Sequence, residues 1–254
     1  MKKGTRAALI TAAVLFAVGL LLCAGALWKV NFNFGALSTN DEPVARSGLA
    51  MTDGLRGIRV EAHSDDVRVT RSADDQIHVV WYDGTYESYE LVTVNGTLVL
   101  REKESDGDKS PAHWLQFDLR EASGIELAVP EGFAGDLDLY TNAGGITCTD
   151  VSIGGEADLE TQSGDASLRS MRAADIRLET SSGSIALDAV QSPELVLSAV
   201  SGDVSGTIDG AAADYTVSAS SVSGDCGLSD RTGSGAGMLT VRTDSGSIDL
   251  RFLR

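Results

Sequence analysis

The sequence predicts an all-β fold, a single β-solenoid coiled from rungs of about twenty residues. The phrase "LETQSGDASL" at residues 159–168 returns as "LETSSGSIAL" at residues 178–187. The chain has 28 Gly but only 4 Pro, and 6% aromatic residues, which favours many short strands and tight turns. A fixed period near this length is typical of architectures in which each unit buries its apolar face against its neighbours.

The repeat centres on a corner that reads Ser-Gly-Asp or Ser-Gly-Ser in most copies. Six corner glycines follow one another at intervals of 20, 19, 19, 22 and 22 residues: Gly144, Gly164, Gly183, Gly202, Gly224 and Gly246. Apolar residues alternate on both sides of each glycine, which indicates half-buried strands. The inward phase shifts across the glycine, so we expect a bend whose backbone angles require glycine. A β-sandwich is the alternative, but it would show irregular strand spacing.

Four columns of the repeat are predicted to face the core. The two columns before the glycine are, at seven residues, Leu137, Ala157, Ile176, Leu195, Val217 and Leu239, and, at five residues, Leu139, Leu159, Leu178, Leu197, Ala219 and Val241. The two columns after the glycine are, at two residues, Ile146, Ala166, Ile185, Val204, Cys226 and Ile248, and, at four residues, Cys148, Leu168, Leu187, Gly206, Leu228 and Leu250. Cys148 and Cys226 would thus be small core residues, four rungs and roughly 19 Å apart, too far for a disulfide.

The preceding region is also rich in strands. Alternating segments occupy residues 58–60, 67–69, 77–79 and 125–129, and Asn95-Gly96 predicts a two-residue hairpin turn. We therefore place the solenoid at residues 55–254 and a stalk or linker at residues 29–54, which are rich in Ser, Asn and Gly.

An apolar run near the N-terminus predicts a membrane anchor. Residues 7–28 carry no charge and are long enough to cross a bilayer as a helix. Lys2, Lys3 and Arg6 favour a cytoplasmic stub at residues 1–6, which makes this a single-pass protein of the cell membrane. A signal peptide cleaved after Ala26 is the alternative, and lipidation at Cys23 is a third. All three place the C-terminal domain outside the cytoplasm.

The charge of the chain argues against a nucleic-acid partner. The net charge is −17, and residues 1–30 hold four of the 20 basic residues but none of the 37 acidic ones. The exported part is therefore more acidic than the whole chain, and it would repel nucleic acid.

Several stretches together resemble a known family. "IRVEAHSDDVRV", "DDQIHVVWY", "NGTLVL", "IELAVPEG" and "LDLYTNAGGI", followed by the Ser-Gly corners, resemble the bacterial putative adhesin family of β-strand repeats. The resemblance covers residues 55–254 and implies a domain of unknown function in envelope proteins. It also implies a second role, since some relatives accompany envelope-stress response systems. The family has no catalytic residues to carry over.

Chemical motifs are absent from the sequence. His63, His78 and His113 stand apart without metal-ligand spacing, and no nucleophile elbow occurs. Asp165, Asp203 and Asp225 stand at corners where other copies have serine, so solvated corners are favoured over calcium binding. We expect no enzyme activity, no cofactor and no metal.

The last strand is the one part of the repeat that we expect to be open. The chain stops shortly after Ile248, Asp249, Leu250 and Arg251, so this strand would present an unpaired edge for a protein, an envelope polymer or a second copy. The sequence thus predicts a non-enzymatic, adhesin-like binding or scaffold module. A sensor of envelope stress and a self-associating structural element are the alternatives.

Overall fold

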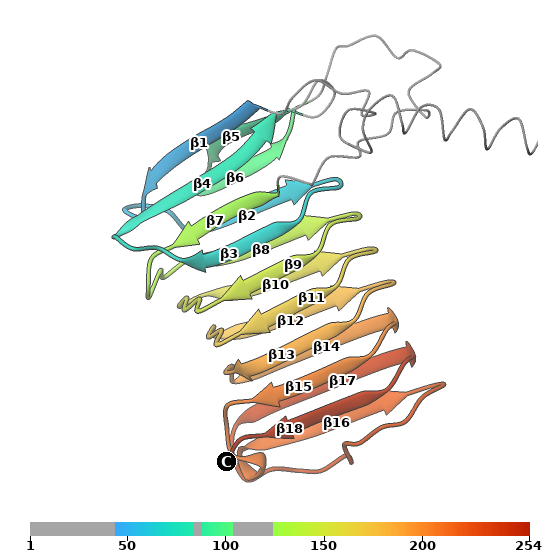
Figure 1. Ribbon diagram of the computed structural model, residues 1–254. Helices are drawn as coiled ribbons and strands as arrows, with labels where there is room; N and C mark the ends of the chain where they lie inside the picture. The colour runs from blue at the N-terminus through green and yellow to red at the C-terminus, as the bar shows by residue number, and fades with distance from the viewer. Residues whose placement is uncertain (1–43, 84–87, 104–123) are drawn as a thin grey trace, which may run out of the picture. The chain divides into compact units, whose positions relative to one another are not determined.

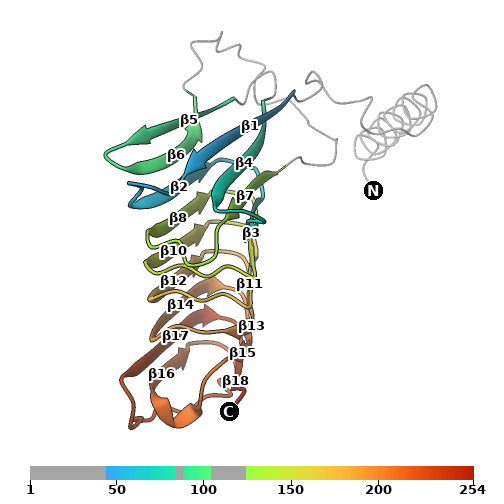
Figure 2. The same cartoon turned by 90° about the vertical axis from the view of Figure 1, so that its left-hand side faces the viewer.

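Two nine-stranded sheets face each other across one apolar core in this computed structural model (Figure 1, Figure 2). The structure describes residues 44–83, 88–103 and 124–254, which belong to one compact unit. Sheet A contains, in spatial order, β1 (Val44–Met51), β4 (Gln76–Asp83), β7 (Ile125–Val129), β3 (Val67–Arg71), β9 (Ile146–Thr149), β11 (Ala166–Arg169), β13 (Ile185–Val190), β15 (Val204–Ile208) and β18 (Ile248–Phe252). Sheet B contains β16 (Tyr215–Ser221), β17 (Gly237–Ser245), β14 (Glu194–Ser201), β12 (Asp175–Thr180), β10 (Glu156–Thr161), β8 (Asp136–Thr141), β2 (Gly57–Ala62), β6 (Thr97–Glu102) and β5 (Tyr89–Val94).

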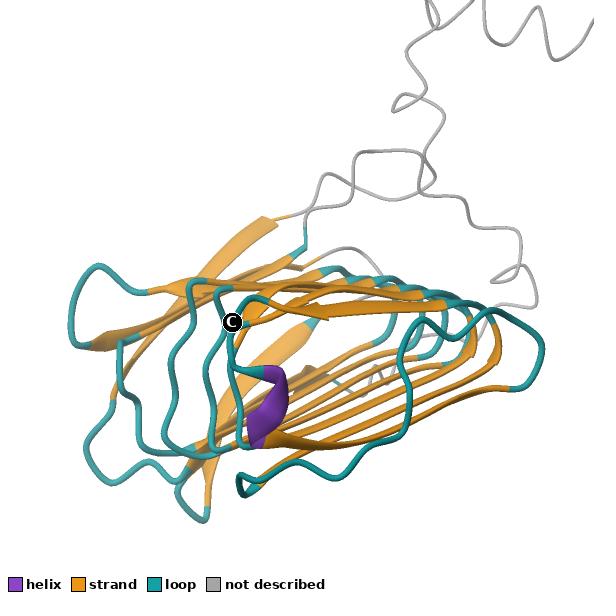
Figure 3. Ribbon diagram, turned by 90° about the horizontal axis from the view of Figure 1, so that it is seen from below, coloured by secondary structure: helices purple, strands orange, loops and turns teal. Residues whose placement is uncertain are grey.

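The central part of the chain coils between the two sheets, one rung for each copy of the repeat. Each rung runs along sheet B, turns at a corner glycine and returns along sheet A, as β8 and β9 do (Figure 1). The view along the coil shows the two layers of strands joined by loops (Figure 3). Neighbouring rungs pair in parallel and in register, so Leu159 lies between Leu139 and Leu178. The predicted all-β class is therefore confirmed, and the coil is solenoid-like.

The predicted core columns are buried with four exceptions. Ala219, Gly206 and Leu228 are only partly buried, and Cys226 is exposed. The other members of the four columns are nearly inaccessible to solvent, including Cys148. The expectation that Cys226 is a core residue is therefore wrong.

The order of the last rungs explains this exception. β14 pairs with β17 rather than with β16, and β15 pairs with β18, so the rung at Gly246 lies directly after the rung at Gly202. β16 and its corner at Gly224 lie one strand further out, at the end of the coil. The second arm of this rung forms only an isolated bridge between Cys226 and Ile248. An arm with so little strand pairing reduces the stability of the coil least at its end, because no further rung has to pair with it there.

The same rung partly covers the end of the coil that we expected to be open. Arg231 and Val217 exchange backbone hydrogen bonds of 2.9 and 3.0 Å on the outer edge of β16. Gly227 donates to the carbonyl of Ile248 at 2.8 Å on the outer edge of β18. The Phe252 ring lies 5.3 Å from the ring of Tyr215 and under the Arg231 guanidinium. Residues 226–231 therefore act as a cap.

The other end of the unit departs from the repeat. β1 pairs antiparallel with β4, and β5 pairs antiparallel with β6 through the predicted hairpin. Asn95 and Gly96 have positive φ angles of 52° and 84°, as a primed two-residue turn requires. β1 falls within residues 29–54, so the sheet begins before the expected boundary at residue 55.

The predicted membrane segment at residues 7–28, its stub and its cleavage and lipidation sites lie outside the described residues. Within the described ranges, no helix has the length and apolar character needed to cross a membrane.

Candidate binding surface

The six corner glycines are placed at the closest approach between rungs. A Cβ atom added to any of them would lie 1.9–2.0 Å from a backbone carbonyl oxygen of the neighbouring corner. None of the six has φ in the left-handed region. Glycine is therefore required because the corners nearly touch, and the expected reason, unusual backbone angles, is wrong.

Side chains also tie the corners together. Thr161 donates its hydroxyl hydrogen to the carbonyl of Gly144 at 2.8 Å and accepts from the N–H of Gly164 at 3.0 Å, and Thr180 makes the same pair of bonds one rung on. The threonine recurs three residues before the glycine, a signal in the sequence that the core columns did not include. These hydroxyls satisfy buried backbone groups that would otherwise have no partner.

Aspartates alternate with smaller residues along the corners in space. The spatial series reads Asp66, Gly145, Asp165, Ser184, Asp203, Ser247, Asp225. Carboxylates of Asp66, Asp165 and Asp203 accept the backbone N–H of the next member at 2.9, 2.8 and 2.7 Å. The corners are therefore self-contained structural elements rather than open ligand sites.

Acidic side chains gather instead on the outer face of sheet B. One row crosses four adjacent strands, with each carboxylate beside the next: Asp136, Glu156, Asp175 and Glu194. A second row contains Glu61, Tyr140, Glu160 and Glu179 on β2, β8, β10 and β12. The pairing of Glu160 with Glu179 follows the predicted register, and Arg177 lies beside Asp158.

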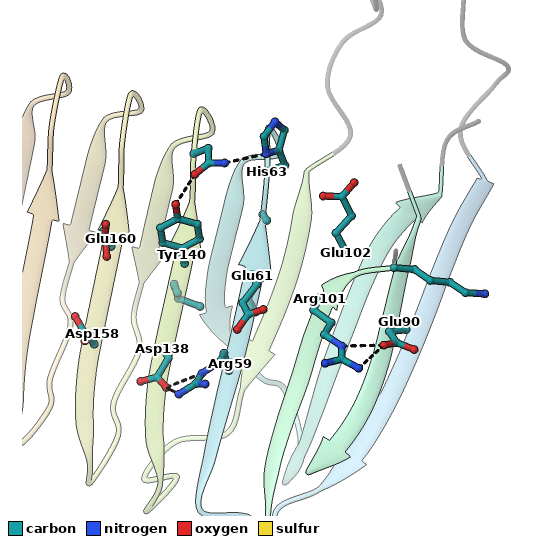
Figure 4. Close-up of a pocket in the computed structure, with 15 residues that line it drawn as sticks. Arg59, Glu61, His63, Glu90, Arg101, Glu102, Asp138, Tyr140, Asp158 and Glu160 are labelled. Carbon is teal, nitrogen blue, oxygen red and sulfur yellow. Dashed lines mark hydrogen bonds and ion pairs between the residues drawn. The ribbon is translucent and has the colours of Figure 1, made fainter. Parts of the chain in front are cut away.

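A hollow of about 1010 Å³ opens in this face where the coil meets the β5–β6 hairpin (Figure 4). Side chains from five strands line it, and carboxylates outnumber cationic groups there: Glu61, Glu90, Glu102, Asp138, Asp158 and Glu160 against Arg59, Arg101 and Lys103. No local sequence pattern predicts this hollow, because its walls come from segments far apart in the chain.

Two ion pairs lie in the walls of the hollow, one on each side. Arg59 on β2 binds Asp138 on β8 at 2.8 Å, and Arg101 on β6 binds Glu90 on β5 at 2.7 Å (Figure 4). The hydrogen bond and charge of Asp138 raise the pKa of Arg59 above its usual value. Partial burial raises the pKa of Asp158, an effect that the nearby Arg177 opposes. The paired guanidinium groups are thus already engaged.

A chain of polar side chains borders the hollow. The Tyr140 hydroxyl donates to Asn142 and accepts from Gln162 Nε2 at 2.9 Å. Asn142 Nδ2 lies 2.8 Å from His63 Nδ1 (Figure 4). Together these contacts span three neighbouring strands and hold the Tyr140 ring in place.

The remaining residues singled out in the sequence lie elsewhere. The predicted edge strand forms most of β18, the last strand of sheet A, and comprises Ile248, Asp249, Leu250 and Arg251. Arg251 makes an ion pair with Asp249 at 3.2 Å. His78 pairs with Asp74 at 2.8 Å, and His113 lies outside the described residues. No group of three metal-binding side chains occurs in residues 44–83, 88–103 and 124–254.

Solved structures of three bacterial proteins are similar to this chain. A "putative cell adhesion protein" from Clostridium sporogenes is 10% identical over 83% of this chain and 100% of its own, with a TM-score of 0.48. A "putative adhesin" from Bacteroides fragilis is 12% identical over 82% and 97%, with a TM-score of 0.40. Another from Parabacteroides merdae is 10% identical over 82% and 96%, with a TM-score of 0.32.

No curated protein sequence matches the chain. The family model described as Toastrack DUF4097 matches residues 55–253, nearly the whole of the strand-rich part. The chain therefore belongs to the Toastrack DUF4097 family.

Proposed function

We propose that this protein is a non-enzymatic binding module that a single N-terminal helix anchors to the cell membrane, with its β-solenoid outside the cytoplasm. The solenoid presents the outer face of sheet B to a partner at the cell envelope. The hollow beside Tyr140 is the observation that carries this proposal, since concave sites with a few convergent polar groups are where proteins bind ligands.

The rest of the structure supports a scaffold with a fixed surface. The corner carbonyls, threonine hydroxyls and aspartate carboxylates join each rung to the next through hydrogen bonds. Such a stack holds the side chains of β2, β8 and β10 at constant spacing, so this wall of the hollow needs no rearrangement before a partner binds.

The anchoring part of the proposal rests on the sequence alone. Residues 7–28 form an uncharged stretch of membrane-spanning length behind the basic residues Lys2, Lys3 and Arg6. Full-length protein in washed membranes of the native host, with its C-terminus accessible to external protease, would agree with it. Released protein whose N-terminus is Leu27 would contradict it.

Photo-crosslinking tests the binding part. A photoreactive amino acid replaces Tyr140 in the hollow of the full chain, and in a second variant it replaces Ser167 on the outer face of sheet A. After irradiation of intact cells, the variant at Tyr140 should yield a discrete crosslinked product that the variant at Ser167 lacks. Equal products from both positions, or none from Tyr140 in a folded and exported protein, would refute binding at the hollow.

A further inference from the structure

Tyr140 lies between two glutamates in the wall of the hollow. Pairing of β8 with β2 sets Glu61 beside Tyr140, and pairing with β10 sets Glu160 on its other side (Figure 4). Neighbouring strands are about 4.8 Å apart, so both carboxylates are within reach of a group placed over the ring. The Tyr140 hydroxyl is held by Asn142 and Gln162, which keeps the ring at this position.

Most of the unpaired charges in the hollow are negative. Arg59 and Arg101 are engaged with Asp138 and Glu90. By contrast, four of the lining carboxylates make no ion pair within the described part of the chain: Glu61, Glu102, Asp158 and Glu160. A cation entering the hollow therefore meets these four acceptors without displacing an existing pair, whereas an anion would meet one lining cation, Lys103, that makes no ion pair within the described residues.

An aromatic ring adds a second attraction for the same kind of ligand. A lysine or arginine head group over the face of a tyrosine is attracted by the ring electrons, in addition to its attraction to nearby carboxylates. Tyr140 is the tyrosine among the lining side chains, and it lies in the acidic row between Glu61 and Glu160. One cation could therefore contact the ring and both flanking glutamates together.

The spacing of the acidic rows fits an extended peptide. Asp138 and Asp158 form a row two residues away from Tyr140 and Glu160 along β8 and β10. Side chains on one face of an extended peptide recur every two residues, about 6.8 Å, which is the same separation. A peptide running parallel to the strands can thus address both rows with two long cationic side chains.

We propose that the hollow binds a basic peptide segment, with one lysine or arginine head group over the ring of Tyr140 between Glu61 and Glu160. This proposal rests on the proposed function, because it names the partner of the same site. A second cationic side chain of the peptide reaches Asp158, the unpaired carboxylate of the other row.

Calorimetric titration of the full chain in a neutral detergent tests this proposal. The probes are a short peptide of alternating lysine and serine and the same peptide with every lysine acetylated. The lysine peptide should bind, and acetylation should abolish binding because it removes the positive charge. Tyr140→Leu should weaken binding about fivefold, and Tyr140→Phe, which keeps the ring, should retain most of the affinity.

The carboxylates are tested against a matched pair on the same face. Glu61→Gln combined with Glu160→Gln should weaken binding about tenfold. Glu156→Gln combined with Glu194→Gln removes the same charge from sheet B outside the hollow. Because dissolved salt screens these more distant charges, this pair should weaken peptide binding by no more than about twofold. Equal losses from the two pairs would show attraction to the acidic face as a whole and would overturn the site.

The outcomes also separate this inference from the proposed function. If the chain crosslinks a partner from position 140 but does not bind the lysine peptide, the proposed binding function stands and the basic-peptide inference is refuted. If the chain binds the peptide at the hollow but yields no crosslinked product in cells, the peptide site stands and the proposed function is refuted. Binding of the acetylated peptide with unchanged affinity would overturn the inference outright.

Discussion

The carboxylate of Asp165 accepts a hydrogen bond from the backbone N–H of Ser184 at 2.8 Å, across one rung of the coil. The spatial neighbour of Ser184 on its other side is Asp203, which in turn accepts from Ser247 at 2.7 Å. Aspartates thus alternate with uncharged residues in space, although Asp203 and Asp225 are consecutive copies in the sequence. The insertion of the Gly246 rung between them restores the alternation and keeps like charges two strands apart.

Ser184→Asp should therefore destabilise the protein. The new carboxylate would lie between those of Asp165 and Asp203, at a cost of about 1 kcal/mol at low ionic strength. Salt should reduce this loss because it screens exposed charges. Urea denaturation at low and high salt measures both effects. Ser167→Asp, whose cross-strand neighbours Thr147 and Ala186 are uncharged, is the control and should show a smaller, salt-insensitive change.

Gly183→Ala should have a much larger effect. The added Cβ would lie 1.9 Å from the carbonyl oxygen of Gly164, so two rungs would have to separate. We expect a loss of about 3 kcal/mol or more in the free energy of unfolding. Gly154→Ala is the matched control, because its Cβ would lie 3.3 Å from the nearest atom, the Cα of Ala134. Similar urea midpoints for the two variants would be inconsistent with the close approach of the corners.

The two described cysteines should react very differently with a maleimide. Burial raises the pKa of the Cys148 thiol to about 12, so it is protonated at neutral pH and is also inaccessible. Cys226 is exposed and should be modified in the native protein. Mass spectrometry of peptides, before and after unfolding in urea, measures this. Five strand spacings, roughly 24 Å, separate the two positions, so a Cys148–Cys226 disulfide in the monomer would contradict the fold.

Engineered disulfides test the order of the last rungs. Thr240 is the cross-strand neighbour of both Val196 and Ser218. In a Cys226→Ser background, Val196→Cys with Thr240→Cys should oxidise to a disulfide, because adjacent strands lie within bonding range. Val196→Cys with Ser218→Cys, separated by two spacings or roughly 9.6 Å, should stay reduced. The reverse result on a non-reducing gel would restore the sequential order.

The period-two pattern of the repeat predicts which side chains are buried but not which rungs are neighbours. Leu195 packs beside Leu239 in the structure, yet Val217 would fit the same column almost as well. Because the columns are interchangeable, local sequence does not specify the order. Cys226 and Gly227 explain the observed order. The second arm that contains them forms only an isolated bridge, so this rung fits only at the end of the coil.

The candidate site was out of reach of the repeat pattern for another reason. Tyr140 and Glu160 belong to successive copies, so their register follows from the corner alignment. Glu61 and Arg101 come from upstream strands. No local sequence pattern indicates that β2 pairs with β8 on one side and with β6 on the other. The hollow arises only when these distant segments meet in sheet B.

Competition at the hollow tests whether the envelope partner binds there through a cationic group. The full chain carrying the photoreactive residue at position 140 is irradiated in cell envelopes with increasing amounts of the alternating lysine peptide. The crosslinked product should disappear as the lysine peptide saturates its site, and the acetylated peptide should have no effect. A crosslinked product that persists undiminished at saturating lysine peptide would show that the envelope partner does not bind through the cationic group that this hollow is built to receive.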